Sequence, residues 1–161
     1  MNKFVKVPLI ALAASILAAA ASAQQLKPED MIQTRQAGYK TMGWNMGKIK
    51  AQLEAGDKFD KKVALSSAKV IQAVANSGMG ALYAPGTDKA VGDVKTALKS
   101  DFFDPANKDE LTKIAVNFMT QANKLAEIAE GGDAKAIQAQ FGELGSSCKA
   151  CHDKFRSKDK H

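Results

Sequence analysis

Residues that build metal clusters and disulfide scaffolds are scarce in this sequence. Its 161 residues include two cysteines, Cys148 and Cys151, and two histidines, of which His161 is the last residue. A tetrahedral zinc site would therefore need Asp or Glu ligands to be complete. A disulfide between cysteines three residues apart would close a very small loop and stabilise the fold little. No cluster of arginines with aromatic residues is present, which argues against a nucleic-acid partner.

Convincing strand patterns are also lacking, as are internal repeats of solenoid length and low-complexity tracts beyond the first residues. A C-x-x-C pair that acts in thiol–disulfide exchange usually lies near a βαβ pattern, which this chain does not have. A helical redox protein that uses a Cys148/Cys151 disulfide and no cofactor remains as an alternative.

The first residues have the pattern of an export signal. Lys3 and Lys6 precede an apolar run over residues 7–21, and Ala21-Ser22-Ala23 is a small-residue cleavage site. The run contains Pro8 and is short for a membrane span, so an uncleaved anchor helix is the less favoured alternative. We therefore expect a cleaved signal peptide, no membrane span after cleavage and a periplasmic location.

Removal of residues 1–23 leaves residues 24–161, a length that suits one domain. The leader holds two of the 23 basic residues and none of the 17 acidic ones, so the formal charge of the mature chain is +4. This mild positive charge could favour acidic partners by electrostatic steering.

Four stretches carry apolar residues at spacings of three and four, which predicts amphipathic helices. Proline or an acidic residue opens each stretch, and glycine or asparagine follows the first three. A short helical piece is also expected over residues 93–103. The short first and third links favour antiparallel neighbours, so the predicted fold is all-α, an antiparallel up-down four-helix bundle. The four expected helices cover residues 28–55, 60–76, 104–131 and 133–155.

The segment Cys148-Lys149-Ala150-Cys151-His152 has the form C-x-x-C-H, the attachment signature of c-type haem. On a helix, residues at positions i, i+3 and i+4 share one face, so both thiols and the imidazole can hold one flat cofactor. The sequence thus predicts one haem c per chain, attached through Cys148 and Cys151, with His152 as the axial iron ligand. Covalent haem attachment in bacteria follows export, which agrees with the leader.

The mature chain resembles the cytochromes c′, the class II cytochromes c. The resemblance rests on four segments and covers essentially all of residues 24–161. A haem motif near the C-terminus separates this class from ordinary small cytochromes c. The segments are Lys27-Pro28-Glu29-Asp30, Arg35-Gln36, Pro85-Gly86-Thr87 and Cys148 to Arg156.

This resemblance implies a five-coordinate, mostly high-spin haem with histidine on one side and an apolar, ligand-free distal side. It implies binding of nitric oxide and carbon monoxide, electron exchange with a partner that the sequence does not identify, and a homodimer formed through the first two helices. We expect a binding and electron-carrying protein, not an enzyme.

Position matching to the family assigns the surroundings of the haem. It places Tyr39 on the distal side, Arg35 and Gln36 near the haem and its propionates, and Arg156 beside the proximal histidine. Tyr83 stands where relatives often have an aromatic residue before the Pro-Gly turn. For Arg35, whose position lies on an apolar stripe, the alternative is a snorkelling surface arginine.

Two features of the expected first helix are less regular. Gly38 and Gly43 stand where alanine is more usual in the family, which puts the stiffness of the helix around Tyr39 in question.

Three methionines, Met31, Met42 and Met46, also lie on this helix. A methionine sulfur on the iron would give a six-coordinate, low-spin electron carrier. We favour the open site, because Tyr39 occupies the distal position of the family and most helix methionines fill the core.

Overall fold

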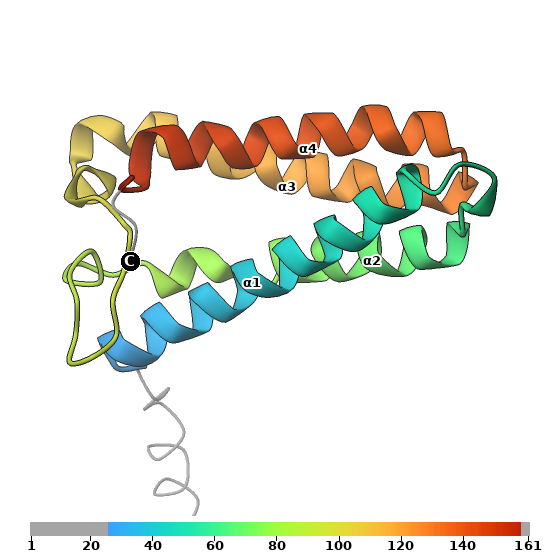
Figure 1. Ribbon diagram of the computed structural model, residues 1–161. Coiled ribbons are helices and arrows are strands. Elements are labelled where there is room, and N and C mark those ends of the chain that lie inside the picture. Colours follow the sequence, from blue (N-terminus) through green and yellow to red (C-terminus); the bar gives the residue numbers. More distant parts are fainter. Residues whose placement is uncertain (1–25, 159–161) are drawn as a thin grey trace, which may run out of the picture.

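Four antiparallel helices make up the body of the protein in the computed structural model, which describes residues 26–158 (Figure 1). The predicted all-α bundle is confirmed, and no strand occurs within these residues. The predicted signal peptide lies outside them. The helices are α1 (Pro28–Leu53), α2 (Lys61–Ala75), α3 (Lys108–Gly131) and α4 (Ala134–Phe155).

Short-range side-chain contacts explain where the helices begin. The Asp60 carboxylate accepts a hydrogen bond from the backbone N–H of Lys62 at 2.8 Å, and the Asp133 carboxylate accepts one from Lys135 at the same distance. Both aspartates therefore cap their helices as predicted. Gly132 has a φ of 73°, a left-handed conformation that glycine adopts readily, and it ends α3.

The long connection between α2 and α3 differs from its predicted structure. Residues 93–103 do not form one helical piece, since only Ser100–Phe103 makes a single 3-10 turn. Before it, Leu98 pairs in extended conformation with Arg156. The third helix starts four residues later than predicted, because Asp104 caps a separate 3-10 turn over Pro105–Asn107. The connection closes the end of the bundle at which α4 ends (Figure 1).

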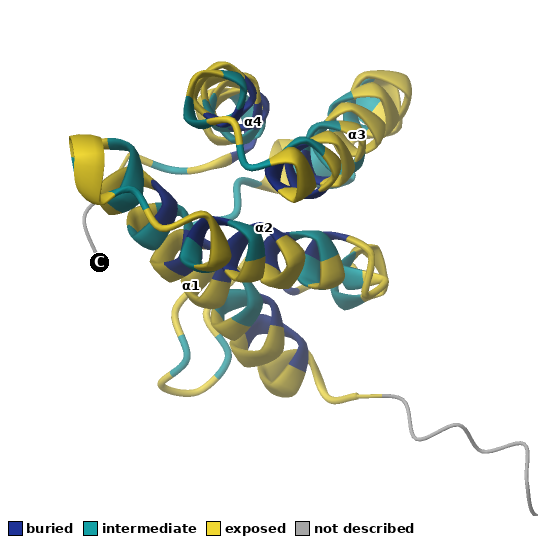
Figure 2. Cartoon of the chain, turned by 90° about the vertical axis from the view of Figure 1, so that its right-hand side faces the viewer, coloured by how far each residue is buried: buried dark blue, intermediate teal, exposed yellow. Residues whose placement is uncertain are grey.

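Burial is greatest where neighbouring helices face each other (Figure 2). α1 packs on α2, α2 on α3 and α3 on α4, whereas α1 and α4 make little contact with each other. Large core side chains include Ile49, Ile71, Leu125, Ile137 and Leu144, all fully buried. Each contributes about 1.5–3 kcal/mol by leaving water. Within residues 26–158, no helix combines the length and the apolar character needed to cross a membrane.

The two unusual glycines of α1 have different surroundings. A Cβ atom built on Gly38 would lie 3.0 Å from Cε of Met79 and 3.5 Å from Cγ1 of Val74. A Cβ atom on Gly43 would meet nothing within 4 Å. Gly38 therefore permits a close approach of Met79 to α1, whereas Gly43 has no packing role inside this chain.

Alanine substitutions should distinguish Gly38, where an added Cβ atom would contact Met79, from Gly43, where it would meet nothing within 4 Å. Gly43→Ala should raise the free energy of unfolding by about 0.5–1 kcal/mol, the helix-propensity gain. Gly38→Ala should raise the free energy of unfolding by less than Gly43→Ala does, or should lower it, because Met79 must move. Denaturant unfolding of the haem-loaded protein measures both. Equal gains would show that the contact with Met79 does not matter.

Candidate functional site

The C-x-x-C-H segment forms the last turns of α4. Cys148 and Cys151 are half-buried and free, whereas His152 is exposed. The motif is therefore not packed inside a helix interface. The reason is the helix arrangement: α4 packs on α3 but hardly touches α1, so the motif borders the space between α1 and α4 instead of a helix interface.

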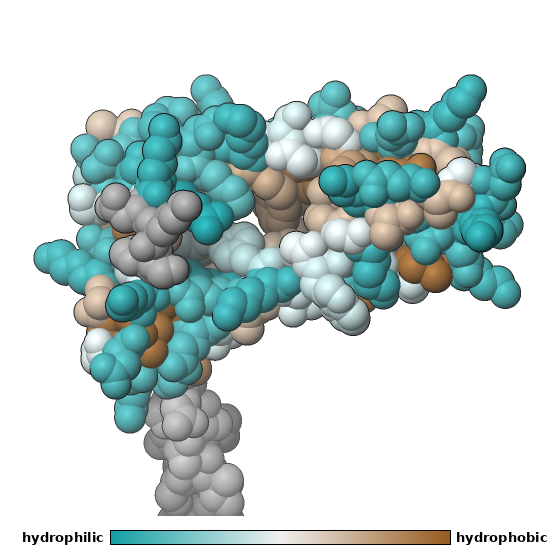
Figure 3. Space-filling model, viewed as in Figure 1, coloured by the Kyte–Doolittle hydropathy of each residue, from teal (hydrophilic) through white to brown (hydrophobic). Residues whose placement is uncertain are grey.

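Tyr39 of α1 faces the same space. Burial raises the pKa of the Tyr39 phenol, and Cys151 and Cys148 also contribute to this rise, so both sulfurs lie near the ring. Figure 3 shows a hollow between the α1 and α4 sides of the molecule, with hydrophobic residues at its floor. A wall with two thiols and an imidazole opposite an aromatic side chain fits a flat, largely apolar macrocycle.

The titration of the motif residues suits metal binding better than thiol chemistry. Partial desolvation of the imidazole lowers the pKa of His152, and the nearby positive charge of Arg156 lowers it further. The neutral imidazole, which is the metal-binding form, is therefore favoured. Burial raises the pKa of both Cys148 and Cys151. Reactive redox cysteines instead have lowered pKa values, so a disulfide-exchange role is disfavoured.

Arg156 is the C-terminal cap residue of α4. Its backbone N–H donates to the His152 carbonyl at 3.1 Å, so it lies one helical turn beyond the histidine. Its own backbone is extended (φ −105°, ψ 129°), and the chain leaves the helix there. The positive charge of Arg156 contributes to the lowered pKa of His152.

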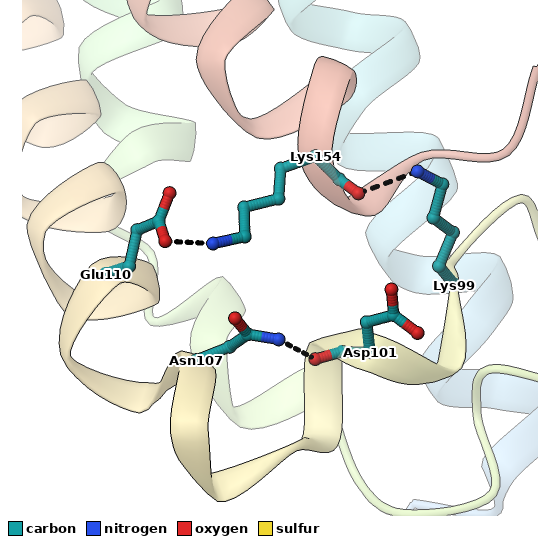
Figure 4. Close-up of polar contacts among 5 residues, drawn as sticks. All are labelled: Lys99, Asp101, Asn107, Glu110 and Lys154. Carbon is teal, nitrogen blue, oxygen red and sulfur yellow. Dashed lines mark hydrogen bonds and ion pairs between the residues drawn. The ribbon is translucent and has the colours of Figure 1, made fainter.

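The end of α4 is held by the connection between α2 and α3. The backbone N–H of Lys99 donates to the Phe155 carbonyl at 2.9 Å, and Ser157 donates to the Ala97 carbonyl at 2.7 Å. Figure 4 shows that Lys99 Nζ also donates to the Lys154 carbonyl, at 2.8 Å, and that Lys154 pairs with Glu110 at the start of α3. In the same view Asn107 Nδ2 donates to the Asp101 carbonyl at 2.8 Å. These bonds fix the turn that carries the histidine.

Tyr39 and Gln36 bond to the same connection. The hydroxyls of Tyr39 and Tyr83 are 2.7 Å apart, and Gln36 Nε2 donates to the Lys95 carbonyl at 2.7 Å. The sequence marked Tyr83 only as an aromatic residue before a turn. Nothing in the sequence pairs its hydroxyl with a residue 44 positions away.

Arg35 is only 3 % exposed, so the snorkelling alternative is wrong. Its two terminal nitrogens donate four hydrogen bonds: to the Leu82 carbonyl, to the hydroxyl and the carbonyl of Thr87, and to the Thr96 hydroxyl. Within residues 26–158, the Nε–H group has no partner. Arg35 thus directs both of its terminal nitrogens to the connection.

The sequence profile of the cytochrome C' family matches residues 30–156. The chain belongs to this family. The cytochrome c′ of Allochromatium vinosum is 54% identical over 142 residues, which cover 88% of this chain and 90% of the relative. The cytochrome c′ of Rhodocyclus tenuis is 44% identical over 133 residues, 83% of this chain and 98% of the relative.

Solved cytochromes c′ share the fold. One, described as having an unusual ligand-controlled dimer dissociation, is 55% identical with a TM-score of 0.78, covering 83% of this chain and 98% of its own. That of Thermochromatium tepidum is 49% identical with the same TM-score of 0.78, covering 83% and 99%. As a cytochrome c′, the chain carries one covalently attached haem c. Its only two cysteines are those of the C-x-x-C-H motif.

The methionines of α1 are core residues in this cytochrome c′. Met31 is 8% exposed and Met42 is 6% exposed. Met42 belongs to the main hydrophobic cluster, together with Ile49 and Leu125, and Met46 packs against that cluster. Their positions support the core-filling interpretation over that of an iron ligand.

Loss of the Thr87 hydroxyl should weaken the fold of this site. This buried hydroxyl accepts from Arg35 at 2.7 Å and donates to the Ala84 carbonyl at 2.8 Å. Thr87→Val should lower the free energy of unfolding by about 1–3 kcal/mol, since it leaves buried polar groups unpaired. Thr112→Val is the control, because that exposed hydroxyl bonds only within α3, and it should change stability by less than about 0.5 kcal/mol. Equal effects in denaturant unfolding would contradict the proposed role of Thr87.

Proposed function

We propose that the protein is an exported mono-haem cytochrome that binds nitric oxide and carbon monoxide at a five-coordinate haem and can exchange electrons. The observation that carries this proposal is the hollow between the α1 and α4 sides of the molecule, together with the influence of Cys151 and Cys148 of α4 on the phenol of Tyr39 of α1. The bound haem supplies the gas-binding and one-electron chemistry.

The proposed attachment uses Cys148 and Cys151, with His152 as the axial ligand. The neutral form of His152 offers a nitrogen lone pair, and the bonds from residues 97–99 to the end of α4 hold its turn in place. Arg156 adds a positive charge beside the imidazole, which favours the ferrous over the ferric state. Ferrous haem is the state that binds carbon monoxide.

On the opposite side, Tyr39 fills space without offering a strong iron ligand. Burial raises the pKa of its phenol, so the phenolate is disfavoured at neutral pH. A gas molecule can then compete with a weakly held side chain instead of with a metal–ligand bond. Structures of variants of the cytochrome c′ of Alcaligenes xylosoxidans have been solved with carbon monoxide and with nitric oxide bound, at 26% identity to this chain.

We also propose a homodimer formed through α1 and α2. Trp44 on α1 is 68% exposed and Val70 on α2 is 38% exposed, so each helix presents an apolar side chain to solvent. Small residues, Gly43 and Gly47, lie beside Trp44 on exposed positions of α1, where a second backbone could approach closely. The relative with ligand-controlled dimer dissociation provides a precedent for such an interface.

The export signal over residues 1–23 supports a periplasmic location, where covalent haem attachment takes place. The redox partner is not identified. The charge of +4 on the mature chain favours an acidic one.

The optical spectrum of the purified protein tests the proposed function directly. The reduced protein should have a broad, high-spin Soret band that shifts on addition of carbon monoxide or nitric oxide. Met42→Leu and Met46→Leu, the matched controls, should leave the spectrum unchanged, because both residues fill the core. Sharp low-spin bands that broaden in either variant would identify a methionine ligand instead, and the lack of haem absorption would overturn the proposal.

Tyr39→Ala should speed carbon monoxide association with the reduced protein by at least about tenfold, equivalent to 1.4 kcal/mol, because the distal space is no longer filled. Stopped-flow mixing with carbon monoxide measures the rate. Val116→Ala serves as the control, since its exposed side chain lies on α3, outside the proposed site and the proposed dimer helices. Unchanged association in Tyr39→Ala would remove Tyr39 from the distal role.

A further inference from the structure

The Tyr39 hydroxyl is hydrogen-bonded to a residue from a distant part of the sequence. It lies 2.7 Å from the hydroxyl of Tyr83, which follows the 3-10 turn Met79–Leu82 after α2. Burial raises the pKa of both phenols, so both are protonated at neutral pH. One hydroxyl therefore donates to the other.

More contacts hold the ring of Tyr83 in place than hold the ring of Tyr39. Its ring stacks on Phe102 with centroids 4.6 Å apart and planes at 20°. The Arg35 guanidinium lies over the same ring at 4.8 Å from its centroid. Phe102 in turn meets the buried Phe155 edge-on at 5.5 Å. Two planar groups thus hold the ring of Tyr83: the hydrogen-bonded guanidinium of Arg35, and the half-buried ring of Phe102, which itself packs on Phe155.

Tyr39 has no comparable support. It is 42% exposed, and α1 fixes its backbone but not the two side-chain torsion angles. Within residues 26–158, its hydroxyl has Tyr83 as its hydrogen-bond partner. A movement of the Tyr39 ring away from the hollow must therefore break this bond, whereas Tyr83 can stay in place.

We propose that Tyr83 is a positioning residue, which holds Tyr39 on the distal side through this hydroxyl–hydroxyl bond and so slows the entry of gas ligands. This inference rests on the proposed function, since it assumes that Tyr39 occupies the distal side. The hydroxyl of Tyr83 is the part that acts, and its ring serves to place that hydroxyl.

Tyr83→Phe is the direct test, because it removes the hydroxyl and keeps the ring that stacks on Phe102. Carbon monoxide association with the reduced haem-loaded protein should become about three- to tenfold faster, the size expected for one net hydrogen bond. The fold-change is below that of Tyr39→Ala, since the ring of Tyr39 remains. Thr120→Val is the matched control: it removes one exposed hydroxyl that bonds within α3, and the rate should not change.

A double-mutant cycle separates positioning from a merely structural effect. Tyr39→Phe removes the same bond from the other side, so it should speed association by a similar factor. The double variant Tyr39→Phe/Tyr83→Phe should be no faster than either single variant, because one bond is lost in all three. Multiplicative effects in the double variant would overturn the inference. Tyr39→Phe also keeps the test decisive if Tyr83→Phe fails to fold.

The failure of this inference can be told apart from failure of the proposed function. If Tyr39→Ala speeds association but both phenylalanine variants behave as the wild type, the distal role of Tyr39 stands. The proposed positioning role of the Tyr83 hydroxyl is then wrong. If Tyr39→Ala has no effect either, the distal assignment itself fails, and the inference falls with it.

Discussion

The buried guanidinium of Arg35 is the contact on which the site depends. Its four hydrogen bonds join α1 to the connection between α2 and α3, through Leu82, Thr87 and Thr96. A desolvated arginine is costly unless its donors are satisfied, so the connection cannot move away without leaving them unpaired. Burial accordingly lowers the pKa of Arg35, although the neighbouring Tyr83, Tyr39 and Asp88 favour its charged form. The connection therefore behaves as a fixed wall of the site.

The bundle itself could be predicted because its signals are local. Apolar spacings of three and four marked each helix, and Asp60 and Asp133 cap α2 and α4 where the sequence suggested. The motif also placed both cysteines on one side of α4 without knowledge of its neighbours. Local signals failed in the connection, where residues 93–103 were expected to be helical. Their extended part is stabilised by pairing with the end of α4, some 58 positions away from Leu98, which no local pattern reports.

The surroundings of the C-x-x-C-H motif also depend on contacts between distant segments, which local sequence patterns do not report. Arg35 was singled out correctly as an arginine in need of a partner, but its partners are main-chain and hydroxyl oxygens of a loop that was read only as a turn. The missed contact of Tyr39 with Tyr83 also joins distant segments. Helix periodicity assumes a neighbour on each apolar face. α4 lacks such a neighbour toward α1, and this departure from close packing is itself the mark of the site.

The connection between α2 and α3 therefore belongs to the site as much as the helices do. It meets the histidine side through Lys99, which bonds to the carbonyls of Lys154 and Phe155, and the distal side through Tyr83. Phe102 links these two contacts, because its ring touches both Tyr83 and Phe155. Helices alone fix only the backbone positions of Tyr39 and His152. One connection that bonds both to the end of α4 and to the Tyr39 hydroxyl places that hydroxyl relative to the turn that carries His152.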